Sequence, residues 1–65
     1  MLLKLREDEV INTTQIVSIT KTNMTVKKSV IRMSNGDVHL HNLGPEKLGD
    51  KIAKAEAAAD TYYFL

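Results

Sequence analysis

The strongest hydrophobic pattern in the chain lies on both sides of Ser34–Asp37, where apolar and polar residues alternate before and after the segment. Its centre, Asn35-Gly36, is the dipeptide preferred in a two-residue type I′ hairpin turn. That turn would pair Ile31 with Leu40 and make one face apolar and the other mainly cationic, as a half-buried antiparallel pair requires. We therefore predict an apolar face of Ile31, Met33, Val38 and Leu40 and an outer face of Val30, Arg32, His39 and His41.

Three shorter segments before the hairpin have the β-branched or alternating composition of strands. They are Leu2–Arg6, Val10–Ile11 and Ile16–Thr22. Glu7-Asp8 and Asn12–Gln15 provide polar turns between them, the second because an Asn side chain can bond its own backbone two residues on. A further loop is expected around residues 23–25.

The residues after Gly44 predict an α-helix. Pro45 suits the first helical position because the N–H that it lacks has no partner there, and the run to about Ala59 is rich in Ala, Lys and Glu. The stripe that would face the sheet consists of Leu48, Ile52, Ala55 and Ala59. We expect one α+β domain over residues 1–65, with a small antiparallel sheet of about four strands (about 2–43), one helix across its apolar face (about 45–59) and an apolar tail (60–65).

The tail holds all three aromatic residues of the chain. Left in water, Tyr62–Leu65 would form an exposed patch of the kind that soluble monomers avoid. We expect the tail to pack back over its own sheet and to add the bulk that an aliphatic core lacks. The alternative is that it crosses to a second subunit or a partner as an added strand. The interface residues would then be Ala55, Ala59, Tyr62, Tyr63, Phe64 and Leu65.

The chain is 65 residues long and contains no cysteine. A domain of this size buries only about 60% of its unfolded surface and is marginally stable without help. The missing cysteines exclude disulfides and thiolate metal sites, which leaves oligomerisation as an aid to stability. We therefore expect a homo-oligomer or a complex with a protein partner.

Nine basic and eight acidic residues give a net charge of +1, which is too balanced to indicate nucleic acid or anionic lipid by itself. No apolar run approaches the roughly 18 residues that a membrane span needs. The N-terminal segment turns acidic at Glu7 and lacks the basic-then-apolar order of a signal peptide. These features predict a cytoplasmic protein without membrane contact.

The patterns that could support catalysis or metal binding are weak. His39 and His41 have a spacing that metal sites use, but Arg32 would repel a cation and no third ligand is near in sequence. The acidic run Glu7–Glu9 is typical of a solvated turn, and three scattered glycines form no phosphate-binding loop. We predict neither an enzyme nor a bound metal or cofactor.

A cationic strip is the best candidate for ligand binding. It consists of Lys27, Lys28, Arg32, His39 and His41. Such a strip can hold phosphate groups or acidic side chains, but the predicted sheet offers no aromatic platform on which bases could stack. The alternative is a solvated outer face, whose Lys and Arg discourage edge-to-edge aggregation.

Three short motifs follow one another along the chain: Glu9–Asn12, Ile16–Ile19 and Ser34–Gly36, the last before an alternating strand. In this order they resemble the FlbD-like proteins of flagellar and swarming motility, a pattern that many small bacterial and phage proteins share. The resemblance covers about residues 2–42 and implies a β-meander followed by a C-terminal helix. It implies no catalytic residue.

These observations leave two functional hypotheses. The first is a non-enzymatic regulatory or interaction module that self-associates or captures a partner through the tail and the alanine face of the helix. The second is binding of nucleic acid or a small anionic nucleotide through the cationic strip, with an oligomer building the pocket between subunits. Phage proteins that sequester host signalling nucleotides would belong to the second class.

Overall fold

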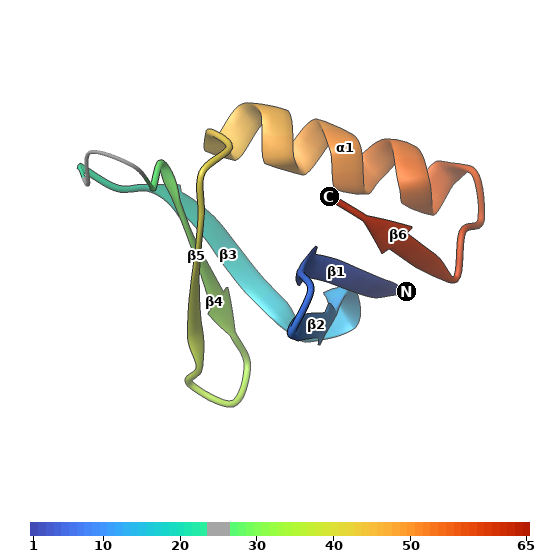
Figure 1. Cartoon of the computed structure of the whole chain (residues 1–65), viewed down its shortest axis with the longest axis horizontal. Coiled ribbons are helices and arrows are strands. Elements are labelled where there is room, and N and C mark those ends of the chain that lie inside the picture. The colour runs from blue at the N-terminus through green and yellow to red at the C-terminus, as the bar shows by residue number, and fades with distance from the viewer. Residues whose placement is uncertain (24–26) are drawn as a thin grey trace.

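The computed structural model describes residues 1–23 and 27–65, which fold into two small β-sheets and one α-helix (Figure 1). The elements in chain order are β1 (Leu2–Arg6), β2 (Glu9–Asn12), the 3-10 turn η1 (Thr13–Gln15), β3 (Ile16–Lys21), β4 (Ser29–Met33), β5 (Val38–His41), α1 (Pro45–Ala57) and β6 (Tyr62–Phe64). The α+β class is confirmed. In place of one sheet of about four strands, the described residues form two three-stranded sheets. The loop expected around residues 23–25 lies largely outside the described residues.

Sheet A has the strand order β2-β1-β6. β1 and β2 form an antiparallel hairpin that is closed by the exposed Glu7-Asp8 turn, as predicted. β6 lies parallel to β1, and backbone hydrogen bonds from Leu2 N to Thr61 O (2.9 Å) and from Leu65 N to Lys4 O (3.0 Å) hold its two ends. The tail therefore packs within its own chain, as expected, but it does so as an added edge strand.

Sheet B has the strand order β3-β4-β5, and both of its strand pairs are antiparallel. The turn η1 carries the chain from the β2 edge of sheet A to the β3 edge of sheet B. Asn12 caps this turn, because its side-chain oxygen accepts a hydrogen bond from Thr14 N at 3.1 Å. The predicted turn at Asn12–Gln15 is therefore confirmed.

The hairpin between β4 and β5 reverses at the predicted place, but its turn is of another type. Gly36 N donates to Met33 O (3.0 Å) and Met33 N donates to Asp37 O (2.9 Å), which makes a three-residue loop. A type I′ turn needs positive φ at both central residues, whereas only Gly36 has it here, at 94°. Asn35 instead accepts a hydrogen bond from Asp37 N through its side chain at 3.0 Å. This local bond stabilises the longer turn.

The extra loop residue shifts the pairing by one position, and a one-residue shift turns every side chain of a strand to the opposite face. Ile31 now pairs with His39 rather than with Leu40. The expected facing of β4 is confirmed, since Ile31 is buried and Arg32 is exposed. The expected facing of β5 is wrong: His41 is only 6% exposed, while Val38 is 51% exposed.

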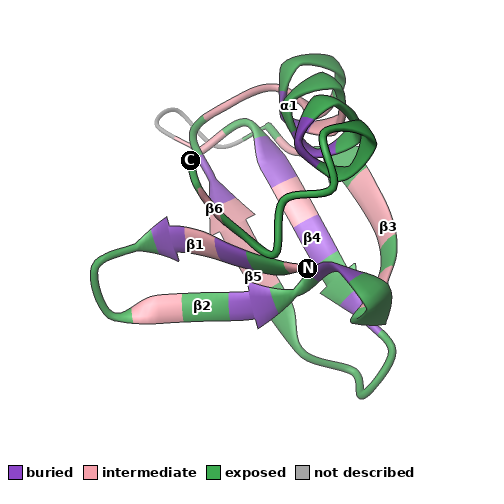
Figure 2. Cartoon of the chain, turned by 90° about the vertical axis from the view of Figure 1, so that its right-hand side faces the viewer, coloured by how far each residue is buried: buried purple, intermediate pink, exposed green. Residues whose placement is uncertain are grey.

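The core lies where sheet A, sheet B and α1 meet, and purple segments of all three converge there in Figure 2. Its buried members are Leu3, Leu5, Ile11, Ile31, Met33, Leu48 and Ile52. The helix begins at Pro45 as predicted and ends at Ala57, two residues earlier than expected. Ala59 is not part of the helical stripe, because it is exposed and adopts a φ of 58° in the turn that follows the helix.

No helix in the parts of the chain that the structure describes has both the length and the apolar character that crossing a membrane requires.

Candidate interaction surfaces

The outer side of sheet A is unusually apolar. The strand register places Leu2 between Asn12 and Tyr62, and it places Lys4 between Val10 and Phe64. We call this set of six residues the aromatic face. Among the described residues six large hydrophobic side chains are exposed, and four of them belong to this face: Leu2 (45%), Val10 (46%), Tyr62 (50%) and Phe64 (58%).

Lys4 lies in the middle strand of the aromatic face. Its ammonium nitrogen lies 5.1 Å from the centre of the Phe64 ring, within the range of a cation–π interaction. This contact places a positive charge beside the ring on a mainly apolar surface. The predicted hairpin had no aromatic side chains, and the tail supplies them on sheet A instead.

The structure divides the six residues that were predicted to form an interface. Ala55 is 3% exposed and belongs to the core of its own chain. Tyr63 and Leu65 point toward the core and are half-buried against it. Tyr62, Phe64 and Ala59 remain exposed. Leu2 and Val10 were not predicted, because only the pairing of β6 with β1 brings them beside the tail.

The cationic strip does not form as predicted. Arg32 and Lys28 are exposed, and Lys27 is half-buried. His39 and His41 turn toward the core side of sheet B as a result of the shifted register. The five residues therefore do not share one solvent face.

The two sheets are joined by an ionic cluster of Arg6, Glu9 and His39. His39 Nδ1 lies 3.0 Å from Glu9 Oε2, and Arg6 Nε lies 3.4 Å from Glu9 Oε1. The second contact lacks hydrogen-bond geometry, so the buried Oε1 atom has no hydrogen bond. Arg6 also donates to Leu40 O at 2.6 Å. Glu9 was expected in a solvated turn, but it holds β2 against β5.

His41 is a neutral acceptor inside the fold. Its Nδ1 atom accepts a hydrogen bond from Leu43 N at 3.1 Å, an arrangement that protonation of Nδ1 would break. Burial lowers the pKa of His41 below its ordinary value of 6.5, and the nearby charges of Arg6 and Lys27 lower this pKa further.

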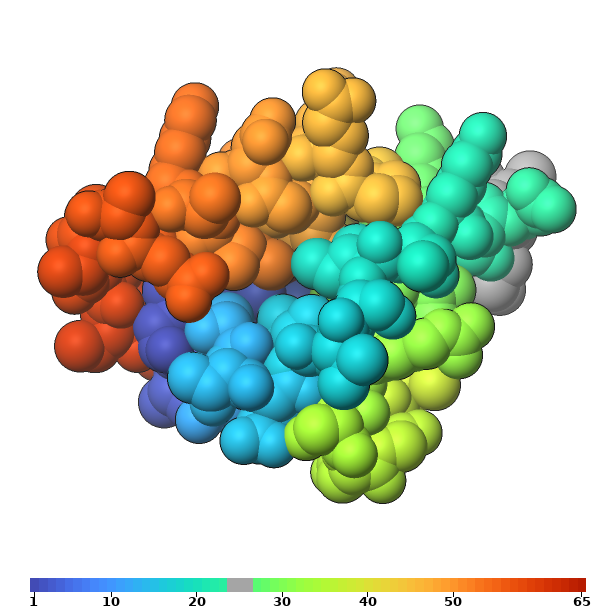
Figure 3. All heavy atoms as spheres, turned by 180° about the vertical axis from the view of Figure 1, so that it is seen from behind, coloured from blue at the N-terminus to red at the C-terminus, as the bar shows by residue number. Residues whose placement is uncertain are grey.

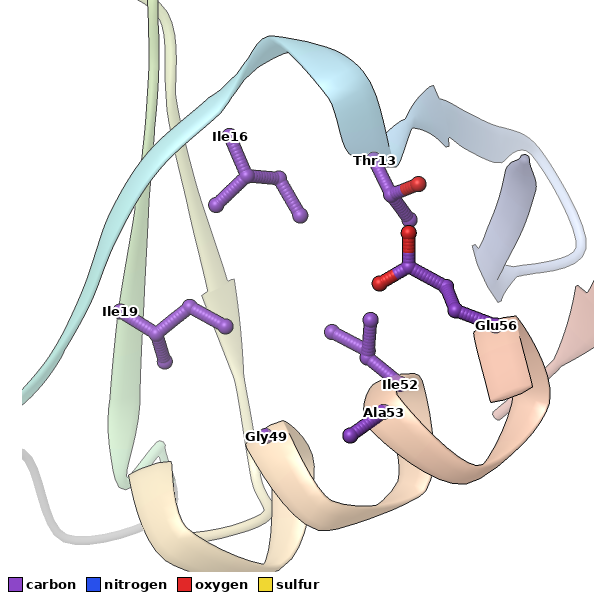
Figure 4. A pocket seen from close by; sticks show the side chains of 7 residues that line it. All are labelled: Thr13, Ile16, Ile19, Gly49, Ile52, Ala53 and Glu56. Carbon is purple, nitrogen blue, oxygen red and sulfur yellow. The ribbon is translucent and has the colours of Figure 1, made fainter.

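An open groove runs between β3 and α1 on the side of the molecule shown in Figure 3, where α1 (orange) lies along the upper rim and β3 (cyan) lies below it. It has a volume of about 240 Å³. Its lining residues are Thr13, Ile16, Ile19, Gly49, Ile52, Ala53 and Glu56, as Figure 4 shows. The groove shares no residue with the aromatic face.

In residues 1–23 and 27–65, no three His, Asp or Glu side chains lie close enough together to hold a metal ion. Searches of protein-family models, of curated proteins and of solved structures found no match to this chain. The resemblance to FlbD-like proteins therefore stays a prediction, and the chemistry of the surfaces themselves must support any functional proposal.

Proposed function

We propose that this chain is a non-enzymatic interaction module that self-associates through the aromatic face of sheet A. The observation that carries the proposal is that four of the six exposed large hydrophobic side chains among the described residues lie together on this face. Scattered exposed apolar residues are normal, but a contiguous apolar patch marks an interaction site. Tyr and Phe are also the residue types enriched at the centres of protein interfaces.

The physical gain is removal of these half-exposed side chains from water. A domain of this size has little stability to spare, and association with a second copy adds buried apolar area without enlarging the chain. Lys4 does not oppose this contact, because its ammonium already lies over the Phe64 ring and its stem can lie along the apolar surface.

Sedimentation equilibrium over a range of chain concentrations tests the proposal. The test variant is Tyr62→Thr with Phe64→Thr, since threonine keeps the β-propensity of β6 and removes both rings. The control is Val38→Thr, which removes a side chain of 51% exposure that lies outside both the aromatic face and β3. Circular dichroism of each variant checks that the fold is retained.

We expect the average mass of the tail variant to fall below that of the unchanged chain at the concentrations where the unchanged chain associates, while the valine control matches the unchanged chain. Equal masses for the tail variant and the unchanged chain would contradict the proposal. Equal losses in both variants would show that exposed hydrophobicity in general, rather than this face, drives association.

A second candidate function is stacking of nucleic-acid bases on the same face. Tyr62 and Phe64 project two residues apart from one strand, with the Lys4 ammonium over the Phe64 ring. Sheet faces that bind single strands combine aromatic platforms with positive charge in this way. This arrangement supports the nucleic-acid hypothesis better than the cationic strip does.

Fluorescence anisotropy with a labelled oligothymidine and an abasic strand of equal length tests this second function. Base stacking predicts that the oligothymidine binds more tightly than the abasic strand, and that Tyr62→Leu with Phe64→Leu removes the difference. Leucine keeps the apolar bulk, so this variant should still self-associate. Equal affinity for both strands would show that binding depends on attraction to the phosphates alone, and it would reject base stacking.

A further inference from the structure

Strand β3 has one unpaired edge. It lies at the end of sheet B, with β4 on one side and no strand on the other within the described residues. Thr22 N donates to Lys28 O at 3.2 Å, which makes Thr22 and Lys28 a hydrogen-bonded pair directly beyond the β3–β4 ladder. Because backbone groups alternate in direction along a strand, Ile19 and Lys21 direct their N–H and C=O groups away from β4. The outer edge of β3 can therefore accept another strand.

The groove beside this edge is shaped for side chains of an added strand. Ile16 and Ile19 form its floor on the β3 side, and Gly49 and Ala53 form a low rim on α1 (Figure 4). The volume of about 240 Å³ lies below the range of roughly 300–1,000 Å³ that drug-sized ligands occupy. Aliphatic side chains carried by a strand suit this open groove better than a compact ligand does.

Two charges of opposite sign lie on this part of the molecule. Glu56 lines the groove beside Thr13, and Lys21 ends β3 two residues after Ile19, outside the groove lining. Neither Lys21 nor Glu56 forms an ion pair within the described part of the chain. A two-fold axis that sets two copies of β3 antiparallel would bring Lys21 of each copy toward Glu56 of the other. A contact between identical surfaces is self-complementary when opposite charges meet twice in this way.

We infer that the groove between α1 and β3, with the free edge of β3, is a second self-association surface that takes strand β3 of another copy. Pairing of the two β3 edges joins the two copies of sheet B into one continuous sheet and places apolar side chains against the grooves. This inference goes beyond the proposed function, because it uses different residues and a different edge. A chain with both surfaces assembles into species larger than a dimer.

Charge reversal separates this surface from the aromatic face. The variants are Lys21→Glu, Glu56→Lys and the two combined, each made in the unchanged chain and in the variant that carries Tyr62→Thr and Phe64→Thr. Both residues are exposed, so the fold should be retained, and circular dichroism checks this. The measurement is again sedimentation equilibrium at several concentrations and at low and high salt.

We expect each single reversal to raise the dissociation constant of the groove contact at least about tenfold at low salt, because like charges then meet twice. The combined reversal should restore association to within about threefold of the starting chain, because the opposite charges are then only exchanged. High salt should reduce the difference between the single and combined variants.

The results for the two surfaces are independent. Unchanged mass in the single reversals, or failure of the combined reversal to restore association, would overturn the groove contact whatever the tail variant does. Loss of mass only in the tail variant would support the aromatic face and reject the groove. Loss and restoration in the charge variants alone would support the groove and reject the aromatic face.

Discussion

Replacement of Gly36 by alanine tests the three-residue turn between β4 and β5. Gly36 has a φ of 94°, and a Cβ added there would meet no atom within 4 Å. Any loss of stability must therefore come from the backbone conformation and not from crowding. Left-handed backbone costs a residue with a Cβ about 1–2 kcal/mol. We expect Gly36→Ala to lower the free energy of unfolding by about that amount.

Gly49 provides a control with the same chemical change. It lies within α1, where an added Cβ also meets no atom within 4 Å. Alanine is about 0.8–1 kcal/mol more favourable than glycine in a helix interior. Gly49→Ala should therefore raise the free energy of unfolding by about 1 kcal/mol. The two variants should differ by about 2–3 kcal/mol, with opposite signs relative to the unchanged chain.

Asn35→Gly distinguishes the observed turn from the two-residue type I′ turn. In a type I′ turn both central residues have positive φ, and a Gly-Gly pair would fit without loss. In the observed turn Asn35 does not have positive φ, and its side chain accepts a hydrogen bond from Asp37 N. Glycine would remove that bond and add backbone freedom in the unfolded chain. We expect a loss of about 1–2 kcal/mol.

Urea unfolding followed by circular dichroism measures all three variants. The chain should be dilute enough to be monomeric, because Gly49 also lines the groove. A change of midpoint at constant slope then reports stability alone. A neutral or stabilising Asn35→Gly would refute the three-residue turn, and with it the register that turns His39 and His41 toward the core.

Three further predictions concern the interior. Because the pKa of His41 is lower in the folded chain than its ordinary value of 6.5, the unfolded chain binds a proton more readily. The free energy of unfolding should therefore be highest above about pH 6.5 and should fall as the pH drops below that value. His41→Asn keeps a side-chain acceptor for Leu43 N and should flatten this fall in urea titrations between about pH 7 and pH 5; an unchanged pH profile would exclude His41 as the cause. Leu48→Ala removes a side chain with 0% exposure and should cost about 2–5 kcal/mol by the same assay, enough to unfold much of a marginal domain. Glu9→Gln removes the charge beside Arg6 and should cost about 0.5–1 kcal/mol at low salt and less at high salt; a loss independent of salt would show a packing effect.

Local features of the sequence predicted the structure correctly where residues close together in the chain determine it. Pro45 marked the helix start, since its missing N–H is tolerated only in the first turn. Leu48 and Ile52 were assigned to the buried stripe from helical spacing alone, and both are buried. The Asn12 turn and the reversal at Ser34–Asp37 also depend on side chains within a few residues of each other.

The candidate surfaces depended on contacts between distant segments. The aromatic face exists only because β6 pairs with β1, about sixty residues earlier in the chain. His39 and His41 face the core because the turn contains one extra residue. The Asn35-Gly36 dipeptide also fits this longer loop, although it prefers the shorter one. Neither outcome is encoded in a local pattern.

By itself, the sequence determined the α+β class, the positions of most strands, the start of the helix and the facing of β4, because periodicity and local capping act over a few residues. The tertiary structure alone decided which strands are neighbours, and therefore which side chains share a surface. Tyr62 and Phe64 became an exposed aromatic face rather than core because a parallel edge strand buries only every second side chain.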